Sequence, residues 1–378
     1  MKNPQILDLY SDYLIASFNF ATATGLSELL DGALSHDQIS RFLGQSLFTQ
    51  QDYWKCVKPL IRKVEHPDGV IKIDDTILEK PHSTVNDIVC WHWDHSRKPQ
   101  AGLVKGINIL NFLYQSPLGA TGPISIPVAF EIVHKTEPYF DKKCSKVKKR
   151  SPKTKNGMAR ERLRILNHIN KVKFRYVLWD SWFSSEDNFE FVHYELKKYF
   201  VAAIKDNRTA ALSMEDKLAG RFHKVKELEV QKDVAITVWL KGLDFPVLLT
   251  RQVFRNKDGS TGELYLVTND LGLTGQATSA TYADRWGVEV FHRSLKQETG
   301  LEKSPTKHEA TQSNHVFAAM IAWTKMELLR IKEQSNHASL KTKLYVKALK
   351  AAFEELQTLK ALPPKALQSA EQATLLLG

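Results

Sequence analysis

Residues 282–296 read Tyr282-Ala-Asp-Arg285-Trp-Gly-Val-Glu289-Val-Phe-His-Arg-Ser-Leu-Lys296. On a helix, steps of about 100° per residue place four polar residues within a stripe roughly 60° wide: Tyr282, Arg285, Glu289 and Lys296. The opposite side carries Val288, Phe291 and Leu295, with Gly287 leaving room for close packing. We therefore expect one face of this segment to dock on a core while the other presents a carboxylate flanked by two cations and a phenol.

A single carboxylate among cations suits a divalent metal ion that must also meet a phosphate backbone. The alternative is an ordinary solvated helix face, in which Arg285 and Glu289 form an i,i+4 ion pair. Two further acidic positions in the chain favour a functional site over that alternative.

Both of these positions close apolar, β-rich runs. Val70-Ile-Lys-Ile runs into Asp74 and Asp75, and Phe174-Arg-Tyr-Val-Leu-Trp runs into Asp180. Each run predicts a buried strand, and a core does not accept carboxylates without a counter-charge. A helix is predicted after Asp180, with Ser184 or Ser185 as its N-cap. Because catalytic groups often lie at the carboxyl ends of strands, these acids predict a shared site.

The four polar residues resemble a known signature. Tyr, two residues, Arg, three residues, Glu, six residues and Lys is the Y-R-E-K motif of the insertion-sequence-four family of D-D-E transposases, and this chain matches it without a gap. Asp-Asp-Thr at residues 74–76 is similar to the first acidic motif of that family, and Asp180 to the second. The resemblance runs from about residue 20 to residue 330.

The resemblance implies a DNA transposase of an insertion sequence that cleaves and transfers strands by in-line phosphoryl transfer. It implies a catalytic, metal-binding triad of Asp75, Asp180 and Glu289 that holds two Mg²⁺ or Mn²⁺ ions, and a role in gripping DNA phosphates for Tyr282, Arg285 and Lys296. Two metals about 4 Å apart suit such a displacement, and all-oxygen ligation suits Mg²⁺ or Mn²⁺ rather than zinc.

The choice between Asp74 and Asp75 rests on strand geometry. Adjacent residues on a strand point to opposite faces, so only one of the two can enter a shared site. Asp75 has the parity of Ile71 and Ile73 and directly precedes Thr76, as the family motif expects. We therefore predict Asp75 as the ligand.

The composition of the chain indicates its expected partners and cellular compartment. The chain has 378 residues, 43% of them hydrophobic, and a formal net charge of +11, which favours a polyanionic partner. Its three cysteines form no metal-binding or disulfide spacing, which predicts a reducing cytoplasm. No signal peptide or membrane span is expected. The predicted partners are double-stranded DNA and a second copy of the chain, in a prokaryotic cytoplasm or on its nucleoid.

The predicted fold is α/β, and the resemblance makes it an RNase H-like core with a β-rich insertion. Strands are expected over 68–77, 107–115, 124–134, 199–205 and 263–268, with a hairpin over 227–253 turning near Gly242. Helices are expected over 157–171, 309–334, 339–359 and 365–376. The predicted regions are a helical DNA-binding region (1–66), two parts of the core (67–206 and 273–334), the insertion (207–272) and C-terminal helices (335–378).

Two outlying segments are further candidates for DNA binding. A helix-turn-helix is predicted where Asp31-Gly32 precedes a capping box of Ser35 and Gln38, with Arg41 among its exposed residues, although many helical hairpins bind nothing. A basic run from residue 142 to residue 155 is either a solvated loop or a sequence-independent grip on the DNA backbone. Lys148, Lys149 and Arg150 are its candidate contacts.

Two other functions compete with the transposase. A stand-alone nuclease or resolvase on the same fold would not need the tyrosine, arginine and lysine grip. A domesticated DNA-binding protein would normally have lost one of the three acids, and all three are present.

Overall fold

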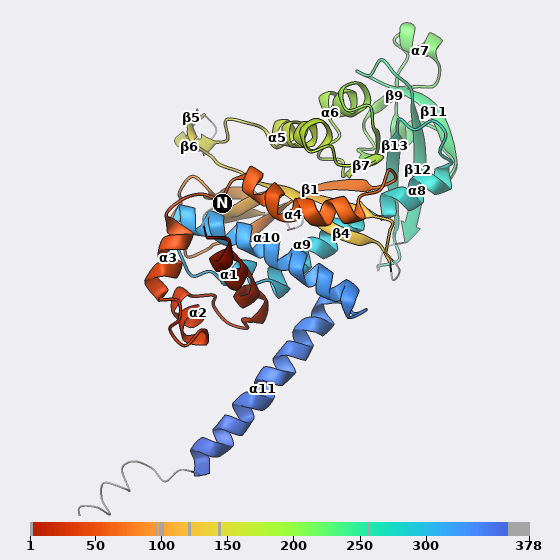
Figure 1. The fold of residues 1–378 in the computed structure, drawn as a ribbon. Helices are drawn as coiled ribbons and strands as arrows, with labels where there is room; N and C mark the ends of the chain where they lie inside the picture. The colour runs from red at the N-terminus through yellow and green to blue at the C-terminus, as the bar shows by residue number, and fades with distance from the viewer. Residues whose placement is uncertain are drawn as a thin grey trace, which may run out of the picture.

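A computed structural model describes residues 3–94, 97, 102–119, 122–142, 145–255 and 258–361. An eleven-stranded mixed sheet crosses the molecule (Figure 1). Its strands are β1 (Val70–Glu79), β2 (Val89–Trp93), β3 (Leu103–Ser116), β4 (Ile124–Ile132), β7 (Tyr176–Trp179), β8 (Tyr199–Ile204), β9 (Thr209–Ala211), β10 (His223–Lys224), β11 (Ala235–Leu240), β12 (Val247–Arg255) and β13 (Thr261–Thr268).

The strands lie in the order β10-β9-β11-β12-β13-β8-β7-β1-β3-β2, and β4 also pairs with β3. The pairs β1–β7 and β7–β8 are parallel, whereas the other pairs in the sheet are antiparallel. The long β3 pairs with β1 on one edge and with β2 and then β4 on the other. The expected strands are confirmed, and the insertion strands continue the core sheet because β13 pairs with β8.

Helices cover both faces of the core strands, and β1 shows the two environments. Ile71 and Ile73 pack in one cluster with residues of α5 (Lys155–Arg164), η2 (Ile165–Ile169), α6 (Glu186–Glu190) and η3 (Phe191–Glu195). On the other face, Leu78 packs in a second cluster with residues of the N-terminal helices, α9 (Trp286–Glu298) and α10 (Glu309–Lys332). A central strand that is buried on both faces needs a near-continuous apolar run, which is what Val70 to Ile73 supply apart from Lys72.

Four helices open the chain: α1 (Pro4–Ala16), α2 (Ala23–Leu29), α3 (His36–Gly44) and α4 (Gln50–Val64). The predicted capping box is confirmed, because the Ser35 side chain accepts from the Gln38 amide and the Gln38 side chain accepts from the Ser35 amide. Asp31 and Gly32 have positive φ values of 51° and 76° and form the turn between α2 and α3. The role of this helical pair in DNA binding stays a prediction.

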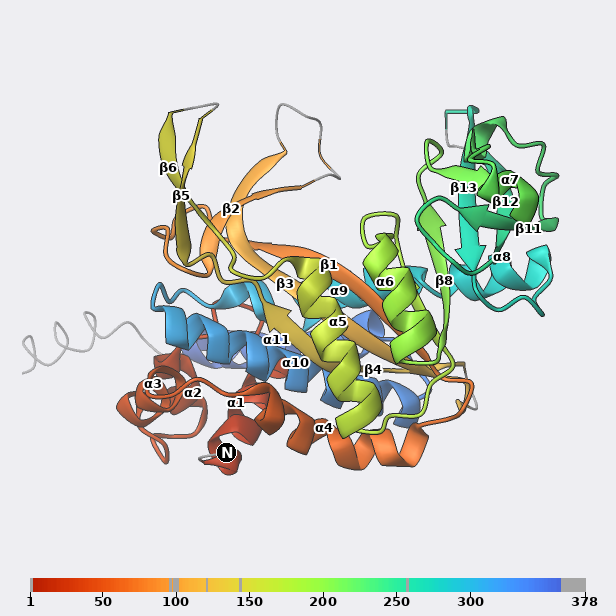
Figure 2. The same ribbon diagram turned by 90° about the horizontal axis from the view of Figure 1, so that it is seen from above.

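Five strands of the structure were not among the expected ones: β2, β5 (Glu137–Asp141), β6 (Lys146–Arg150), β9 and β10. Part of the basic run forms β6, which pairs with β5 rather than remaining a loop. All five residues of β6 are exposed. A hairpin needs a partner strand, and β5 gives little pattern in the sequence because four of its five residues are exposed. Figure 2 shows α5 and α6 between this hairpin and the insertion strands β9–β13.

The segment from Tyr282 to Lys296 is not one continuous helix. α8 (Gly275–Ala283) ends before Asp284, and α9 begins at Trp286. The Arg285 and Gly287 amides bond to the carbonyls three residues back, so a tighter turn separates α8 from α9. The expected packing side is confirmed, since Val288, Phe291 and Leu295 are buried.

The chain continues through η5 (Leu301–Lys303) and α10 into α11 (His337–Ala361), which confirms two of the C-terminal helices. The helix predicted over 365–376 lies outside the described residues. Two short elements complete the insertion: α7 (Met214–Leu218) and η4 (Val225–Glu227). Within the described ranges, no helix is long and apolar enough to cross a membrane.

Candidate active site

Two parallel strands bring two of the acids to one edge of the core. Lys72 on β1 pairs with Leu178 on β7, and two residues further along each strand lie Asp74 and Asp180. Asp180 directly follows β7, and its carboxylate accepts a hydrogen bond from the Trp182 amide at 3.0 Å. That bond closes a turn before α6, whose N-cap is Ser185, one of the two predicted candidates.

The third acid comes from α9, on the face of the sheet that Asp74 occupies. Ligand atoms of Asp74, Glu289 and His292 all lie within 4.8 Å of one another. Arg285 lies beside both acids: its Nη1 is 3.5 Å from Asp74 Oδ2 and 3.4 Å from Glu289 Oε1. The break between α8 and α9 thus leaves a cation at the start of α9, next to the carboxylates.

The electrostatics of this cluster show a shortage of positive charge. Burial and the neighbouring charges of Asp180, Glu289 and Asp75 raise the pKa of Asp74 to about 8, although Arg285 opposes the rise. Burial also raises the pKa of Asp180. A group of carboxylates that repel one another in a half-buried site is stabilised by a further cation. The ligand atoms that meet here come from two carboxylates and one imidazole, with the Asp180 carboxylate near enough to influence Asp74. Carboxylate oxygens are the donors that Mg²⁺ or Mn²⁺ prefers, so the acids present fit a divalent metal ion.

Asp74, and not the predicted Asp75, faces Glu289. As the alternation of side chains along a strand predicts, Asp75 shares a face of β1 with Ile71 and Ile73. That face, however, meets α5, whereas α9 packs on the other one. Asp75 is engaged there by two groups: Lys155 Nζ lies 2.8 Å from its Oδ1, and Asn108 Nδ2 donates to its Oδ2 at 2.6 Å. Tertiary packing decides which face of β1 the third acid approaches. The local sequence of β1 does not determine this.

The three predicted phosphate-gripping residues lie close to the acids but differ in exposure. Tyr282 is buried, and burial raises its pKa to about 12. The Arg285 guanidinium lies 5.7 Å from the centre of the Tyr282 ring. Lys296 donates from Nζ to the Ile77 carbonyl at 2.8 Å, which ties α9 to β1. The motif is therefore also part of the packing between α9 and the sheet.

Sequence reasoning missed two residues around the acids. His292 is buried and bonds through Nε2 to Asn111 of β3 at 3.0 Å; burial lowers its pKa to about 3 and keeps it neutral. His292 follows Glu289 by three residues, so the two side chains lie on one face of the helix. This spacing could have identified His292 from the sequence. Lys72 is fully buried under Gly287, bonds to Gln115 and has a pKa lowered to about 8 by burial. Lys155, the last residue of the predicted basic run, also reaches this region, where its Nζ lies 4.3 Å from the centre of the Trp182 ring.

The four remaining candidate DNA contacts lie on β6 and α3 rather than on α9. Lys148, Lys149 and Arg150 are on the exposed β6, where each forms an ion pair: with Asp141 at 2.7 Å, Asp87 at 2.6 Å and Glu137 at 3.3 Å respectively. Arg41 is exposed on α3, and its Nε donates to the Asp37 carbonyl. The structure does not bring these four cations into the acid cluster.

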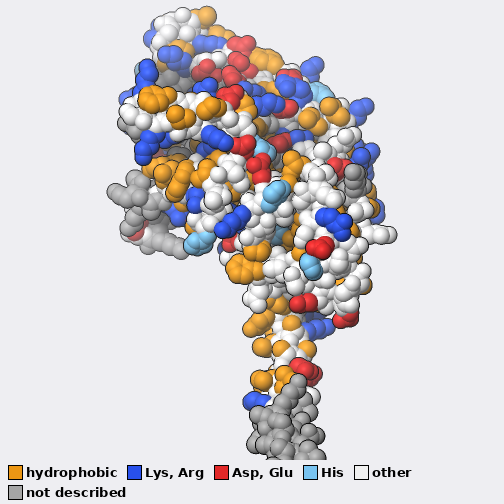
Figure 3. All heavy atoms as spheres, turned by 90° about the vertical axis from the view of Figure 1, so that its left-hand side faces the viewer, with side chains coloured by type: hydrophobic (Ala, Val, Ile, Leu, Met, Phe, Trp, Pro, Cys, Tyr) orange, Lys and Arg blue, Asp and Glu red, His pale blue; other side chains and the backbone are white. Residues whose placement is uncertain are grey.

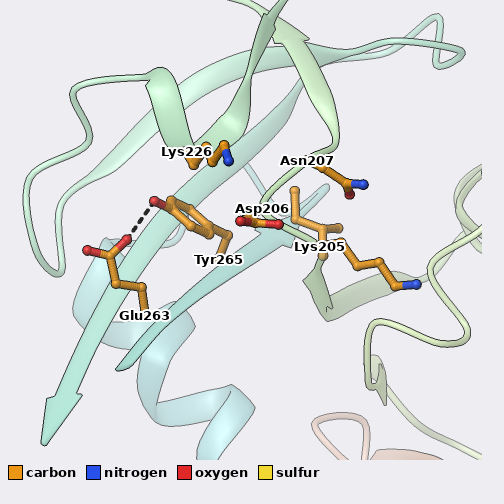
Figure 4. A pocket seen from close by; sticks show the side chains of 7 residues that line it. Lys205, Asp206, Asn207, Lys226, Glu263 and Tyr265 are labelled. Atoms are coloured by element: carbon orange, nitrogen blue, oxygen red, sulfur yellow. Dashed lines mark hydrogen bonds between the residues drawn. The ribbon is translucent and has the colours of Figure 1, made fainter. Parts of the chain in front are cut away.

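A separate polar cavity of about 550 Å³ opens in the insertion (Figure 4). In its wall the Tyr265 hydroxyl donates to Glu263 at 2.9 Å. None of the clustered acids contributes to its lining, which consists of Ile204, Lys205, Asp206, Asn207, Lys226, Glu263 and Tyr265.

Comparison with known proteins supports the transposase resemblance. Residues 147–325 match the family model described as a transposase DDE domain. A protein of Sinorhizobium fredii (strain NBRC 101917 / NGR234) named "Putative transposase y4zB" is 29% identical over 150 residues, which cover 39% of this chain and 39% of that protein. The match thus spans about two fifths of the length of the relative. The matched region, which is similar to a transposase DDE domain, includes Asp180 and Glu289 but begins after β1.

Proposed function

We propose that the chain is a DNA transposase of an insertion sequence, which cleaves at the ends of its element and joins the freed 3′-hydroxyl groups to target DNA. The observation that carries the proposal is the convergence of β1, β7 and α9. These elements gather Asp74, Asp180 and Glu289 around Arg285, and Asp180 and Glu289 lie within the region that matches a transposase DDE domain. Such an acidic cluster is unfavourable without a bound cation and suits phosphoryl transfer.

The proposed catalytic fold is RNase H-like. The order β4-β3-β1-β7-β8 supports it, because an antiparallel meander is followed by two strands that run parallel to β1. The intact spacing of Tyr282, Arg285, Glu289 and Lys296 further supports membership of the insertion-sequence-four family.

The proposed metal ligands are Asp74, Asp180 and Glu289, so Asp74 replaces Asp75 in the triad predicted from sequence. Two divalent ions held there would lower the pKa of an attacking water, or activate a 3′-hydroxyl, and stabilise the departing oxygen. His292 stays neutral and is fixed by Asn111, so it adds no positive charge that would oppose cation binding. Asp75 takes the supporting role of holding Lys155 beside Trp182.

The chain's cations are proposed to bind and orient the DNA. A guanidinium presents several donors, so Arg285 can contact a phosphate while it remains beside Asp74 and Glu289. Tyr282 fixes the place of Arg285 through ring contact, and Lys296 lies further along α9. Lys148, Lys149, Arg150 and Arg41 are proposed to hold the DNA backbone at a distance from the reaction. The protein is proposed to act on double-stranded DNA in the cytoplasm.

The test is a cleavage assay with purified protein, Mg²⁺ and a plasmid that carries the native flanks of the gene. The Glu289→Gln variant removes one carboxylate charge at nearly constant volume, and Glu298→Gln, at the end of the same helix, is the matched control. We expect wild type and Glu298→Gln to nick at the ends of the element, and Glu289→Gln to bind the same DNA without nicking it.

Other results would give a different function. Cleavage at sites unrelated to the ends would indicate a stand-alone nuclease. Specific binding to the ends without cleavage by any of the three proteins would indicate a DNA-binding protein that has lost its chemistry. Equal cleavage by wild type and Glu289→Gln would remove Glu289 from the reaction.

A further inference from the structure

Lys155, the first residue of α5, brings a cation to the clustered acids from the face of the sheet opposite to α9. Its Nζ lies 2.8 Å from Asp75 Oδ1 and 4.3 Å from the centre of the Trp182 ring. An ammonium group has three N–H donors, and within the described part of the chain only Asp75 accepts one of them. Since 24% of the side chain is exposed, Lys155 can donate to a further acceptor, which the fully buried Lys72 cannot.

Lys155 and Arg285 approach one part of β1 from opposite faces. β7 ends just before Asp180, whereas β1 continues past that level to Glu79. No described strand replaces β7 there, so the edge of β1 that faces β7 becomes free next to Asp180. Burial raises the pKa of Asp180, and while Arg285 opposes the rise, the charge of Asp75 adds to it. Asp180 therefore senses charged groups from both faces of β1, and the two cations flank the free edge.

Contacts between α5 and the segment after Asp180 fix the place of Lys155. Asn156, the next residue of α5, accepts a hydrogen bond from Asn188 of α6 at 2.9 Å, and the two helices lie side by side (Figure 2). The Trp182 amide donates to the Asp180 carboxylate at 3.0 Å, so the ring beside the ammonium group is tied to one of the clustered acids. A group that is held in place before its ligand arrives loses little freedom on binding.

On the basis of the proposed function, we infer that Lys155 binds the DNA phosphate group that reacts at Asp74, Asp180 and Glu289, from the face of β1 opposite to Arg285. The two non-bridging oxygens of a phosphodiester share one negative charge, so a cation on each side can contact one of them. The acids repel such a phosphate, and surface cations offer it little compensation. Basic and acidic side chains are interspersed on the face that Figure 3 shows, and the candidate cations of β6 each pair with an acid.

A purely structural alternative makes Lys155 no more than the counter-ion of Asp75. That carboxylate is also held by Asn108, which donates to its other oxygen at 2.6 Å, and its pair with Lys155 is partly exposed to solvent. Ion pairs that solvent reaches contribute little to stability. A structural pair would also be indifferent to the charge of any one phosphate, whereas a phosphate contact depends on it. DNA in which a single phosphate is neutral therefore separates the two roles.

The test measures DNA binding by fluorescence anisotropy with a methylphosphonate, which removes the charge of one phosphate, at the position of the nick. Every protein carries Glu289→Gln and is measured with Mg²⁺, so that the DNA is bound without being cut. On unmodified element ends, adding Lys155→Gln should weaken binding about tenfold, as expected for one charge-assisted hydrogen bond. With the methylphosphonate at the nick this loss should disappear, and with the methylphosphonate a few nucleotides away it should remain about tenfold.

Two further variants show that the effect belongs to the Lys155 cation. Lys153→Gln is the matched control, because Lys153 is exposed, lies two residues earlier and pairs with Glu161 at 2.6 Å. It should bind every DNA as the parent protein does. Lys155→Arg keeps a cation and should restore most of the binding, together with its dependence on the charge of the reacting phosphate. Each comparison is a ratio between two DNAs on the same protein, so a partly unfolded preparation does not change it.

The outcomes separate this role from the proposed function. A wild type that does not nick at the element ends would overturn both, because there would be no reacting phosphate for Lys155 to bind. A wild type that nicks there, combined with a Lys155→Gln loss that persists when the reacting phosphate is neutral, would overturn the role of Lys155 alone. Equal binding of unmodified ends with and without Lys155→Gln would do the same and would leave Lys155 as the counter-ion of Asp75.

Discussion

Arg285 and Asp74 are 211 residues apart in the chain, yet the Arg285 guanidinium lies 3.5 Å from the Asp74 carboxylate. The same nitrogen lies 3.4 Å from Glu289. This arginine therefore joins the middle of β1 to the start of α9 and offsets part of the repulsion between the two acids. The catalytic roles proposed above depend on that relationship, because it sets which carboxylate of β1 faces α9.

Replacing Asp74 should affect metal binding more than replacing its neighbour. Asp74→Asn is expected to weaken Mn²⁺ binding by at least about tenfold, the loss typical even of residues one layer outside a metal site. Asp75→Asn is the matched control, because its side chain contacts Lys155 and Asn108 instead of Glu289. Isothermal titration of both variants with Mn²⁺ would decide the assignment. A larger loss for Asp75→Asn would return the metal site to the choice made from sequence.

Removing Arg285 should make the protein less stable and more responsive to metal. Arg285→Ala leaves a half-buried acidic cluster without its cation, so the free energy of unfolding without metal should fall by about 3 kcal/mol. A bound cation then relieves more repulsion, and Mg²⁺ should raise the melting temperature of this variant more than that of wild type. Arg285→Lys keeps the charge and should lie between them in differential scanning fluorimetry. Identical melting curves for all three proteins would show that Arg285 does not offset the acids.

Acid should weaken the contact between α10 and the base of α11 through Glu327. Burial alone would raise the pKa of Glu327, but hydrogen bonds from His337, Arg330 and the Ser125 amide lower it on balance from its ordinary value of 4.5. A lowered folded-state pKa stabilises the fold above pH 4.5, and this contribution is lost as the pH falls through the folded pKa. Glu327→Gln should therefore cost about 3 kcal/mol near pH 7 and progressively less below about pH 4.5.

Urea denaturation of wild type and Glu327→Gln at several pH values between neutrality and acid would measure this difference. Glu333→Gln is a suitable control, since that carboxylate is exposed and its ion pair with Lys343 lies at the surface. A difference in unfolding free energy that stays constant with pH would mean that Glu327 stabilises α10 by packing rather than by charge.

Salt dependence should reveal whether β6 binds the DNA backbone. Removing a cation that binds one phosphate lowers the slope of log K against log salt concentration by about one. Lys148→Ala/Lys149→Ala/Arg150→Ala should thus bind DNA with a slope smaller by about three, whereas Lys63→Ala on α4 should leave the slope unchanged. Fluorescence anisotropy with labelled DNA over a range of NaCl concentrations gives both slopes. An unchanged slope would leave β6 as a surface hairpin stabilised by Asp141, Asp87 and Glu137.

Local features whose causes lie within a few residues could be predicted from the sequence alone. The Ser35–Gln38 capping box, the Ser185 N-cap and the buried side of α9 follow from hydrogen-bonding groups and apolar spacing along one segment. The strands that carry Asp74 and precede Asp180 were likewise predicted from apolar runs, although β1 continues past Asp74 to Glu79 while β7 does end before Asp180. These patterns are strong because each one satisfies backbone groups or buries side chains locally.

How those segments meet depends on tertiary packing. Packing places Asp74 beside Glu289 and Asp75 beside Lys155, because α9 lies on one face of β1 while α5 covers the other. It also broke the Tyr282–Lys296 segment before Trp286, paired the exposed β6 with β5, and placed Lys155 against Asp75. Each of these outcomes depends on contacts between residues far apart in the chain, and the alternation of side chains along a single strand leaves both faces equally available until another element packs against one of them.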